Sequence, residues 1–200
     1  EMEFYIKKYR AQNFDFYDLT TIVRKDWIVE FCRKVIKKNW NITWQMPAGT
    51  RSEALDSEAL ELMVLSGQKN ISYAPESGSE TTLQNIKKKI KINTMLKSIK
   101  SAVSKGLNVK LNLMMGFPDE THKDIFRTLI FIKNAAVMGV NDVYVACFSP
   151  YPGSELFDRL RKNGQIPDMN DEYFLKLTSY SDILHSHSYS SHLGNRTLTF

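Results

Sequence analysis

Polar side chains that could bind a small molecule follow several short apolar runs of this sequence. The stretch YAPESGSE (Tyr73–Glu80) places a carboxylate, two hydroxyls and a glycine directly after one run. Asp18 and Arg51 follow the two runs before it, and Gly116 and Tyr151 follow the two runs after it. Carboxylates accept hydrogen bonds from ammonium and hydroxyl groups, arginine pairs with carboxylates, and glycine lets a ligand approach the backbone closely. These residue types predict a site for a small ligand with several polar groups.

The elements that would position these side chains repeat along the chain. Each apolar run ends in a polar turn and is followed by a segment with helical periodicity. The runs are Phe14–Thr20, Asn41–Thr50, Asn70–Ser79, Asn108–Pro118 and Asp142–Pro152. This order predicts an α/β fold of right-handed β-α-β units, with parallel strands buried on both faces. Five successive units favour part of a (β/α) TIM-like barrel over a doubly wound sheet, and both place ligands at the carboxyl ends of the strands.

The segments between the runs have features of helices, namely apolar residues along one face and capping residues at the ends. Ile28, Phe31, Cys32, Val35 and Ile36 form one apolar stripe. A second helix is expected over about 56–66, with Gly67 as the residue that ends it. The expected N-terminal residues of later helices are Asn93 or Thr94, Thr121 or His122, and Ser154.

Composition and charge limit the function classes. The chain has 200 residues and is 42% hydrophobic, which suits one globular domain. Its apolar runs are shorter than the roughly 20 residues of a membrane helix, and no signal peptide leads it, so we expect a cytoplasmic protein. The net charge is +5, with lysines clustered at Arg33–Trp40 and Ile86–Lys91. Solvated helix faces account for these clusters better than a nucleic-acid surface, so we do not expect nucleic acid as a partner.

Two cysteines, Cys32 and Cys147, are far apart in the sequence. This number excludes a disulfide framework and a complete Cys-ligated metal site within the chain. Both cysteines are expected in the core. The tail His185–Phe200 holds three histidines, for which we expect a disordered or edge segment and no metal role.

Four motifs, FDFYDLT, APESGSETTLQNIKKKI, GFPDET and SPYPGSELF, occur in this order at the ends of expected strands. They resemble the second half of the radical S-adenosylmethionine (SAM) superfamily, and within it the Fe–S oxidoreductases that often carry a cobalamin-binding domain. The resemblance implies about five βα units of a six-unit core. Residues 1–165 would form this partial barrel, and residues 166–200 would form a partly irregular extension.

Members of that superfamily bind SAM and a [4Fe–4S] cluster held by a Cys-x3-Cys-x2-Cys loop. This chain has no such loop, so the resemblance implies an inactive fragment whose cluster ligands lie upstream. The parent enzyme would cleave SAM reductively to a 5′-deoxyadenosyl radical acting on an unknown small-molecule substrate. Flavodoxin or ferredoxin would be its electron donor, and cobalamin a further cofactor in the full-length protein.

The resemblance also implies roles for the polar residues after the strands. Asp18 would accept hydrogen bonds from the SAM ammonium group, and Arg51 would pair with the SAM carboxylate. Glu76 and Ser77 would bind the ribose diol. Gly116 would let the backbone approach adenine, and Tyr151 would lie against adenine or the substrate. Turn and helix-cap chemistry is the alternative for each position.

Three other functions stay open at this point. One is a radical SAM enzyme that modifies tRNA, similar to methylthiotransferases. Another is a non-enzymatic basic (β/α) module that binds RNA or a protein through its lysines. The last is a complete small barrel enzyme that uses Glu76 as a base.

Overall fold

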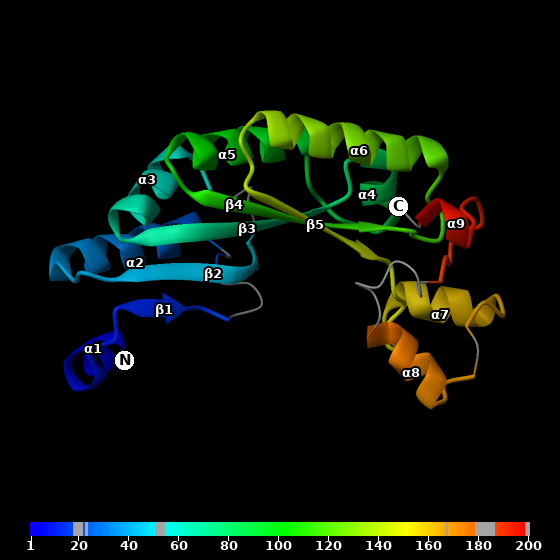
Figure 1. Ribbon diagram of the computed structural model, residues 1–200, viewed down its shortest axis with the longest axis horizontal. Coiled ribbons are helices and arrows are strands. Elements are labelled where there is room, and N and C mark those ends of the chain that lie inside the picture. The colour runs from blue at the N-terminus through cyan, green and yellow to red at the C-terminus, as the bar shows by residue number, and fades with distance from the viewer. Residues whose placement is uncertain (18–21, 23, 51–54, 167, 179–186, 199–200) are drawn as a thin grey trace. The chain divides into compact units, whose positions relative to one another are not determined.

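The computed structural model describes residues 1–17, 22, 24–50, 55–166, 168–178 and 187–198. Helices and strands alternate through most of this range (Figure 1). In chain order they are α1 (Met2–Tyr9), β1 (Asn13–Asp15), α2 (Lys25–Lys38), β2 (Thr43–Thr50), α3 (Ser57–Leu65), β3 (Gln68–Glu76), α4 (Glu80–Asn85), α5 (Ile92–Ser104), β4 (Asn108–Met115), α6 (His122–Val137), β5 (Asp142–Cys147), α7 (Glu155–Lys162), α8 (Asp171–Thr178) and α9 (Asn195–Leu198).

The five strands form one sheet in the order β1-β2-β3-β4-β5. β1 pairs in parallel with β2, and β2 pairs in parallel with β3. The backbone bond from Asn141 to Val109 joins the starts of β5 and β4, and the bond from Phe148 to Met115 joins their ends. This pairing makes β4 and β5 parallel as well. The predicted α/β fold, a parallel sheet built from successive βα units, is confirmed.

By its internal contacts, the chain divides into two compact units. Unit 1 comprises Glu1–Pro75, Ile90–Asn112 and Lys133–Val143, and unit 2 comprises Glu76–Lys89, Leu113–Ile132 and Tyr144–Phe200. The boundary at residue 165 that the sequence predicts stays a prediction.

The core of unit 1 lies between the strands and the helices α2, α3 and α5, and α3 contacts both of the others (Figure 1). Trp44 on β2 is 1% exposed, and its indole Nε1 donates to the Ser66 carbonyl at 3.1 Å. Gly67 follows α3 with a φ of 102°, and a Cβ there would lie 2.2 Å from the Ile42 carbonyl oxygen. Gly67 therefore ends this helix, as predicted.

The apolar stripe on α2 differs in part from the prediction. Ile28, Cys32 and Val35 are buried, but Ile36 is 39% exposed and Val29 is buried in its place. The buried face of α2 is therefore rotated slightly toward Val29. Cys32 lies in the core, as predicted.

β4 is not buried on both faces. Along β4 buried residues alternate with half-exposed ones, so that Val109 and Leu111 are buried while Lys110 and Asn112 are half-exposed. The expectation of two buried faces was wrong here, because alternate side chains of a strand point to opposite faces and only one face of β4 is fully covered.

The core of unit 2 includes part of the C-terminal tail. Leu193 and Leu198 pack with Met115, Ile125 and Cys147, and Tyr189 packs with Phe148. The predicted disordered or edge tail is therefore wrong for residues 187–198, because its apolar side chains are buried; His185 lies outside the described residues. Among the helices of the described ranges, none is long and apolar enough to cross a bilayer.

Candidate functional site

The predicted binding residues of unit 2 follow three neighbouring strands. Glu76 is the last residue of β3, Gly116 follows β4, and Tyr151 lies in the loop after β5. Because parallel strands end at the same edge of a sheet, these loops share one edge. We call Glu76–Ser79, Gly116–Glu120 and Phe148–Pro152 the carboxyl edge. Asp18 and Arg51 lie outside the described residues.

Glu76 has an uncommon backbone conformation and an ion pair. Its φ is 63°, in the left-handed region that non-glycine residues seldom adopt. Its carboxylate Oε1 lies 2.8 Å from the Lys88 Nζ, and the two side chains are 20% and 36% exposed. The carboxylate is therefore held in place and still reachable by solvent.

Ser77 and Ser79 point into the protein. The Ser77 hydroxyl is fully buried, lies 3.0 Å from Thr128 Oγ1, and accepts a hydrogen bond from the Ser79 amide. The Ser79 hydroxyl donates to Asp124 Oδ1 at 2.6 Å and lies at the N-cap of α4. These serines hold the turn against α6, so the geometry favours Glu76 over Ser77 as the group facing a ligand. The SAM contact of Ser77 stays a prediction.

Asp124 links this turn to the start of α6. Its Oδ2 accepts hydrogen bonds from the Thr121 amide at 3.1 Å and the Thr121 hydroxyl at 2.6 Å. Burial, the largest influence, would raise the pKa of Asp124, but the hydrogen bonds from Ser79 and Thr121 and the charge of Arg127 together lower it. The Asp124 carboxylate thus binds the turn at Ser79 to the start of α6 at Thr121.

The turn after β4 is organised by a second buried carboxyl group. Glu120 is 1% exposed, and its Oε2 accepts hydrogen bonds from the amides of Gly116 (2.6 Å) and Phe117 (3.3 Å). Gly116 has a φ of 89°, and a Cβ there would lie 2.9 Å from Leu198. Neither Glu120 Oε1 nor Thr82 Oγ1 has a hydrogen-bond partner in the described part of the chain, although both are buried.

Tyr151 is 53% exposed, and its hydroxyl donates to the Leu177 carbonyl at 3.4 Å. The loop around it is fixed by Tyr173, whose hydroxyl donates to the Pro150 carbonyl at 2.6 Å. Ser154 caps α7 by accepting from the Phe157 amide, as predicted. The aromatic face of Tyr151 is thus available at the carboxyl edge.

Four residues that hold these turns were not predicted from the sequence: Lys88, Glu120, Asp124 and Thr128. Thr121-x-x-Asp124 is a capping box, in which each residue's side chain bonds the other's amide, and this signal is visible in the sequence. α6 begins at His122, one of the two predicted residues, with Thr121 directly before it, whereas α5 begins at Ile92, before Asn93 and Thr94. The pairings of Lys88 and Thr128 have no local sequence signal.

The chain does not fit an iron–sulfur cluster on its own. Such clusters are held by three or four thiolates, and the chain has two cysteines. Both are buried, Cys32 on α2 and Cys147 at the end of β5. Burial raises the pKa of the Cys32 thiol to about 11. The described residues also hold no group of three or more His, Cys, Asp or Glu side chains placed for a metal ion.

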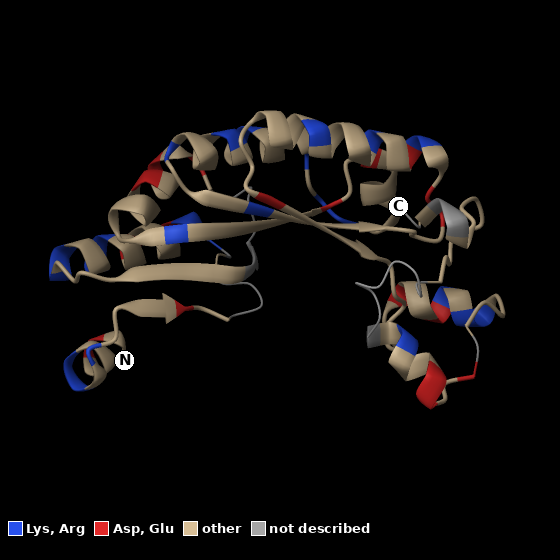
Figure 2. Ribbon diagram, viewed as in Figure 1, with Lys and Arg blue, Asp and Glu red and all other residues tan. Residues whose placement is uncertain are grey.

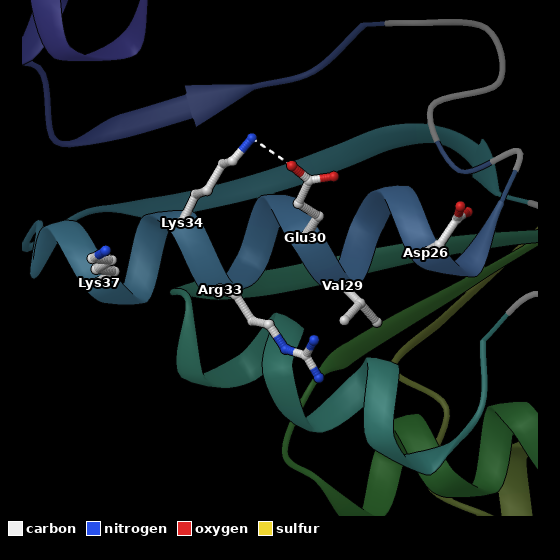
Figure 3. A pocket seen from close by; sticks show the side chains of 6 residues that line it. All are labelled: Asp26, Val29, Glu30, Arg33, Lys34 and Lys37. Atoms are coloured by element: carbon white, nitrogen blue, oxygen red, sulfur yellow. Dashed lines mark ion pairs between the residues drawn. The ribbon is translucent and has the colours of Figure 1, made fainter.

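A shallow groove of about 300 Å³ lies elsewhere, along the exposed side of α2 (Figure 3). It is lined by Asp26, Val29, Glu30, Arg33, Lys34 and Lys37. Glu30 and Lys34 form an ion pair at 2.6 Å across it. Because all of these side chains come from one helix surface, the groove provides no converging groups for a ligand.

Comparison with known proteins identifies the family. The model of the radical SAM superfamily matches residues 1–132, and the chain belongs to this superfamily. Enzymes of the superfamily use SAM and a [4Fe–4S] cluster.

Several curated proteins are similar to the chain. An uncharacterized methyltransferase of Pyrococcus horikoshii is 24% identical over 163 residues, 82% of this chain and 34% of that protein. The anaerobic magnesium-protoporphyrin IX monomethyl ester cyclase of Rubrivivax gelatinosus is 21% identical over 175 residues, 88% of this chain and 31% of that protein. The chain thus spans about a third of the length of these relatives.

A solved structure shares the fold. The radical SAM methyltransferase TsrM of Kitasatospora setae, with cobalamin and a [4Fe–4S] cluster bound, superposes with a TM-score of 0.65 at 9% identity. The match covers 82% of this chain and 30% of that one. At this identity the likeness shows the fold alone, and it supports the barrel-like arrangement of the βα units.

Proposed function

We propose that this chain forms the SAM-binding carboxyl edge of a radical SAM enzyme that cleaves SAM to act on a small molecule. The observation that carries the proposal is the alignment of Glu76, Gly116 and Tyr151 at the ends of three neighbouring strands in a chain of this superfamily. The cluster that supplies the electron for cleavage would be held by residues other than Cys32 and Cys147. We place the enzyme in the cytoplasm, with a flavodoxin or ferredoxin as its electron donor.

Each functional group of SAM would bind a different residue. Asp18 would accept from the ammonium group, and Arg51 would pair with the carboxylate through two parallel bonds. Glu76 would bind the ribose diol. Gly116 and Tyr151 would contact the adenine, with Tyr151 stacking on its ring.

The basic clusters do not support an RNA-binding alternative. Lys87 pairs with Glu155 at 2.6 Å, Lys88 pairs with Glu76, and Lys38 pairs with Glu3 at 2.9 Å. Figure 2 shows acidic residues among the basic ones on α2 and α6. Lysines that are paired with carboxylates present little net charge to a phosphate backbone.

Binding of S-adenosylhomocysteine, which the enzyme cannot cleave, tests the site without a cluster. Isothermal titration of the chain should show affinity about tenfold weaker in Glu76→Gln and in Asp18→Asn, because a hydrogen bond to a charged group contributes about 1.5–3 kcal/mol. Glu80→Gln, an exposed carboxylate four residues from Glu76, is the matched control and should bind like the wild type. Unchanged affinity in both test variants would show that the site is misplaced.

Methyl transfer is a second candidate for the reaction. The observation that favours it is the similarity to a curated protein named as a methyltransferase. The products separate the candidates: methyl donation leaves S-adenosylhomocysteine, whereas reductive cleavage without methyl transfer gives 5′-deoxyadenosine and no S-adenosylhomocysteine. Mass spectrometry of the whole enzyme's SAM-derived products, after anaerobic cluster reconstitution, distinguishes them.

A further inference from the structure

Lys88 is placed next to Glu76 by a helix-ending turn. After α4 the Lys87 amide donates to the Gln84 carbonyl, and the Lys88 amide donates to the Leu83 carbonyl at 2.8 Å. With Lys87 at a φ of 58°, this is a Schellman motif, which reverses the chain after the helix. The motif accounts for the positive φ of Lys87 and directs Lys88 back toward the end of β3.

The positive φ of Glu76 has no such helix-ending role. Two other described non-glycine residues with positive φ, Arg10 and Asn39, are C-caps of helices. Glu76 instead ends a strand, in a conformation that is unfavourable for a residue with a side chain. Backbone strain of this kind persists where the surrounding structure holds it, and it concentrates at ligand sites.

The ion pair between Lys88 and Glu76 occupies one side of the carboxylate. Lys88 Nζ contacts Oε1 at 2.8 Å, and within the described residues no group donates to Oε2. The Glu76 side chain is 20% exposed, so its remaining oxygen can be reached from outside. An ammonium group held on one oxygen limits the rotamers of the carboxylate, which leaves Oε2 as a fixed acceptor.

We propose that Lys88 is a positioning residue that holds the Glu76 carboxylate so that Oε2 accepts a hydrogen bond from a ribose hydroxyl of the bound nucleoside. This inference rests on the proposed function. A ribose diol supplies two O–H donors, and a pre-oriented carboxylate loses less conformational entropy on binding them. Lys88 itself need not touch the ligand.

The test compares two ligands that differ only at the diol. Adenosine and 2′,3′-dideoxyadenosine are titrated into the 200-residue chain and its variants. The wild type should bind adenosine more tightly. Lys88→Met should weaken adenosine binding about tenfold and leave dideoxyadenosine binding nearly unchanged, because the lost hydrogen bond involves the diol. Lys88→Arg should restore most of the preference, and Lys89→Met, an exposed neighbouring lysine, should behave as the wild type.

The outcomes separate the two proposals. A wild type with no preference for adenosine, together with an unaffected Glu76→Gln, rejects the proposed site itself. A Glu76→Gln variant that loses the preference while Lys88→Met keeps it rejects only the role of Lys88. Equal weakening of both ligands in Lys88→Met, with a lower Tm, shows that the ion pair supports folding alone and also rejects the role. If Lys88→Met does not fold, Lys88→Gln replaces it. The ratio of its affinities for adenosine and 2′,3′-dideoxyadenosine then decides.

Discussion

At the scale of single residues, Glu120 is a buried group whose charge state depends strongly on its surroundings. Burial raises its pKa from 4.5 to about 7, although hydrogen bonds from the amides of Gly116 and Phe117 oppose the rise. Nearby Asp124 adds to it through charge repulsion. The same carboxyl group holds the turn after β4, so its protonation acts directly on the carboxyl edge.

Glu120 should therefore make the protein less stable as the pH rises. The folded-state pKa lies above the unfolded value, so the folded protein binds the proton more tightly. This stabilisation is fully present below about pH 4.5 and is lost as the pH rises through about 7, by up to about 3 kcal/mol.

Glu120→Gln, which cannot ionise, should flatten the dependence of the free energy of unfolding on pH in this window, measured by urea denaturation. Glu80→Gln, on the exposed side of α4, should keep the wild-type slope. Equal slopes in wild type and Glu120→Gln would contradict the prediction.

At the scale of elements, the turn between β3 and α4 packs directly on α6. The Gly78 amide donates to Thr128 Oγ1 at 3.1 Å, and the Thr128 hydroxyl also bonds the Asp124 carbonyl. A Cβ at Gly78 would lie 2.5 Å from the Phe131 Cβ and 2.8 Å from the Thr128 Cα. The turn and the helix can approach this closely only because residue 78 has no side chain.

Gly78→Ala should destabilise the protein by about 1–3 kcal/mol, because the clashing atoms belong to or adjoin the α6 backbone and cannot rotate away. Thermal unfolding should show the lower Tm, and S-adenosylhomocysteine binding should weaken with it because Glu76 precedes the same turn. Gly194→Ala is the matched control, since a Cβ there meets no atom within 4 Å. A Tm equal in both variants would show that the turn can move away from α6.

At the scale of the whole molecule, the two cysteines are placed for packing. Cys32 lies in unit 1 and Cys147 lies in unit 2, and both are buried. After anaerobic incubation with iron and sulfide and removal of unbound metal, the chain should retain no [4Fe–4S] absorbance. The double variant Cys32→Ser/Cys147→Ser should give the same spectrum. Four iron atoms per chain in the wild type, lost in the double variant, would contradict the prediction.

The sequence by itself determined the α/β class, the order of the five strands along the chain, and the strand ends at which polar residues gather. These features are local, because strand and helix periods, capping residues and turn glycines act over a few neighbouring residues. The motifs around Glu76 and Gly116 also indicate the superfamily.

Only the tertiary structure decided how the polar groups are used. Ser77 pairs with Thr128, 51 residues away, and Lys88 turns back to Glu76, so the Ser77 hydroxyl holds the turn against α6 while the Lys88 amino group holds a carboxylate. The tail residue Leu198 packs on Gly116 instead of lying at an edge. Such pairings depend on which side chains meet after the chain has folded back on itself, and no local pattern encodes that meeting.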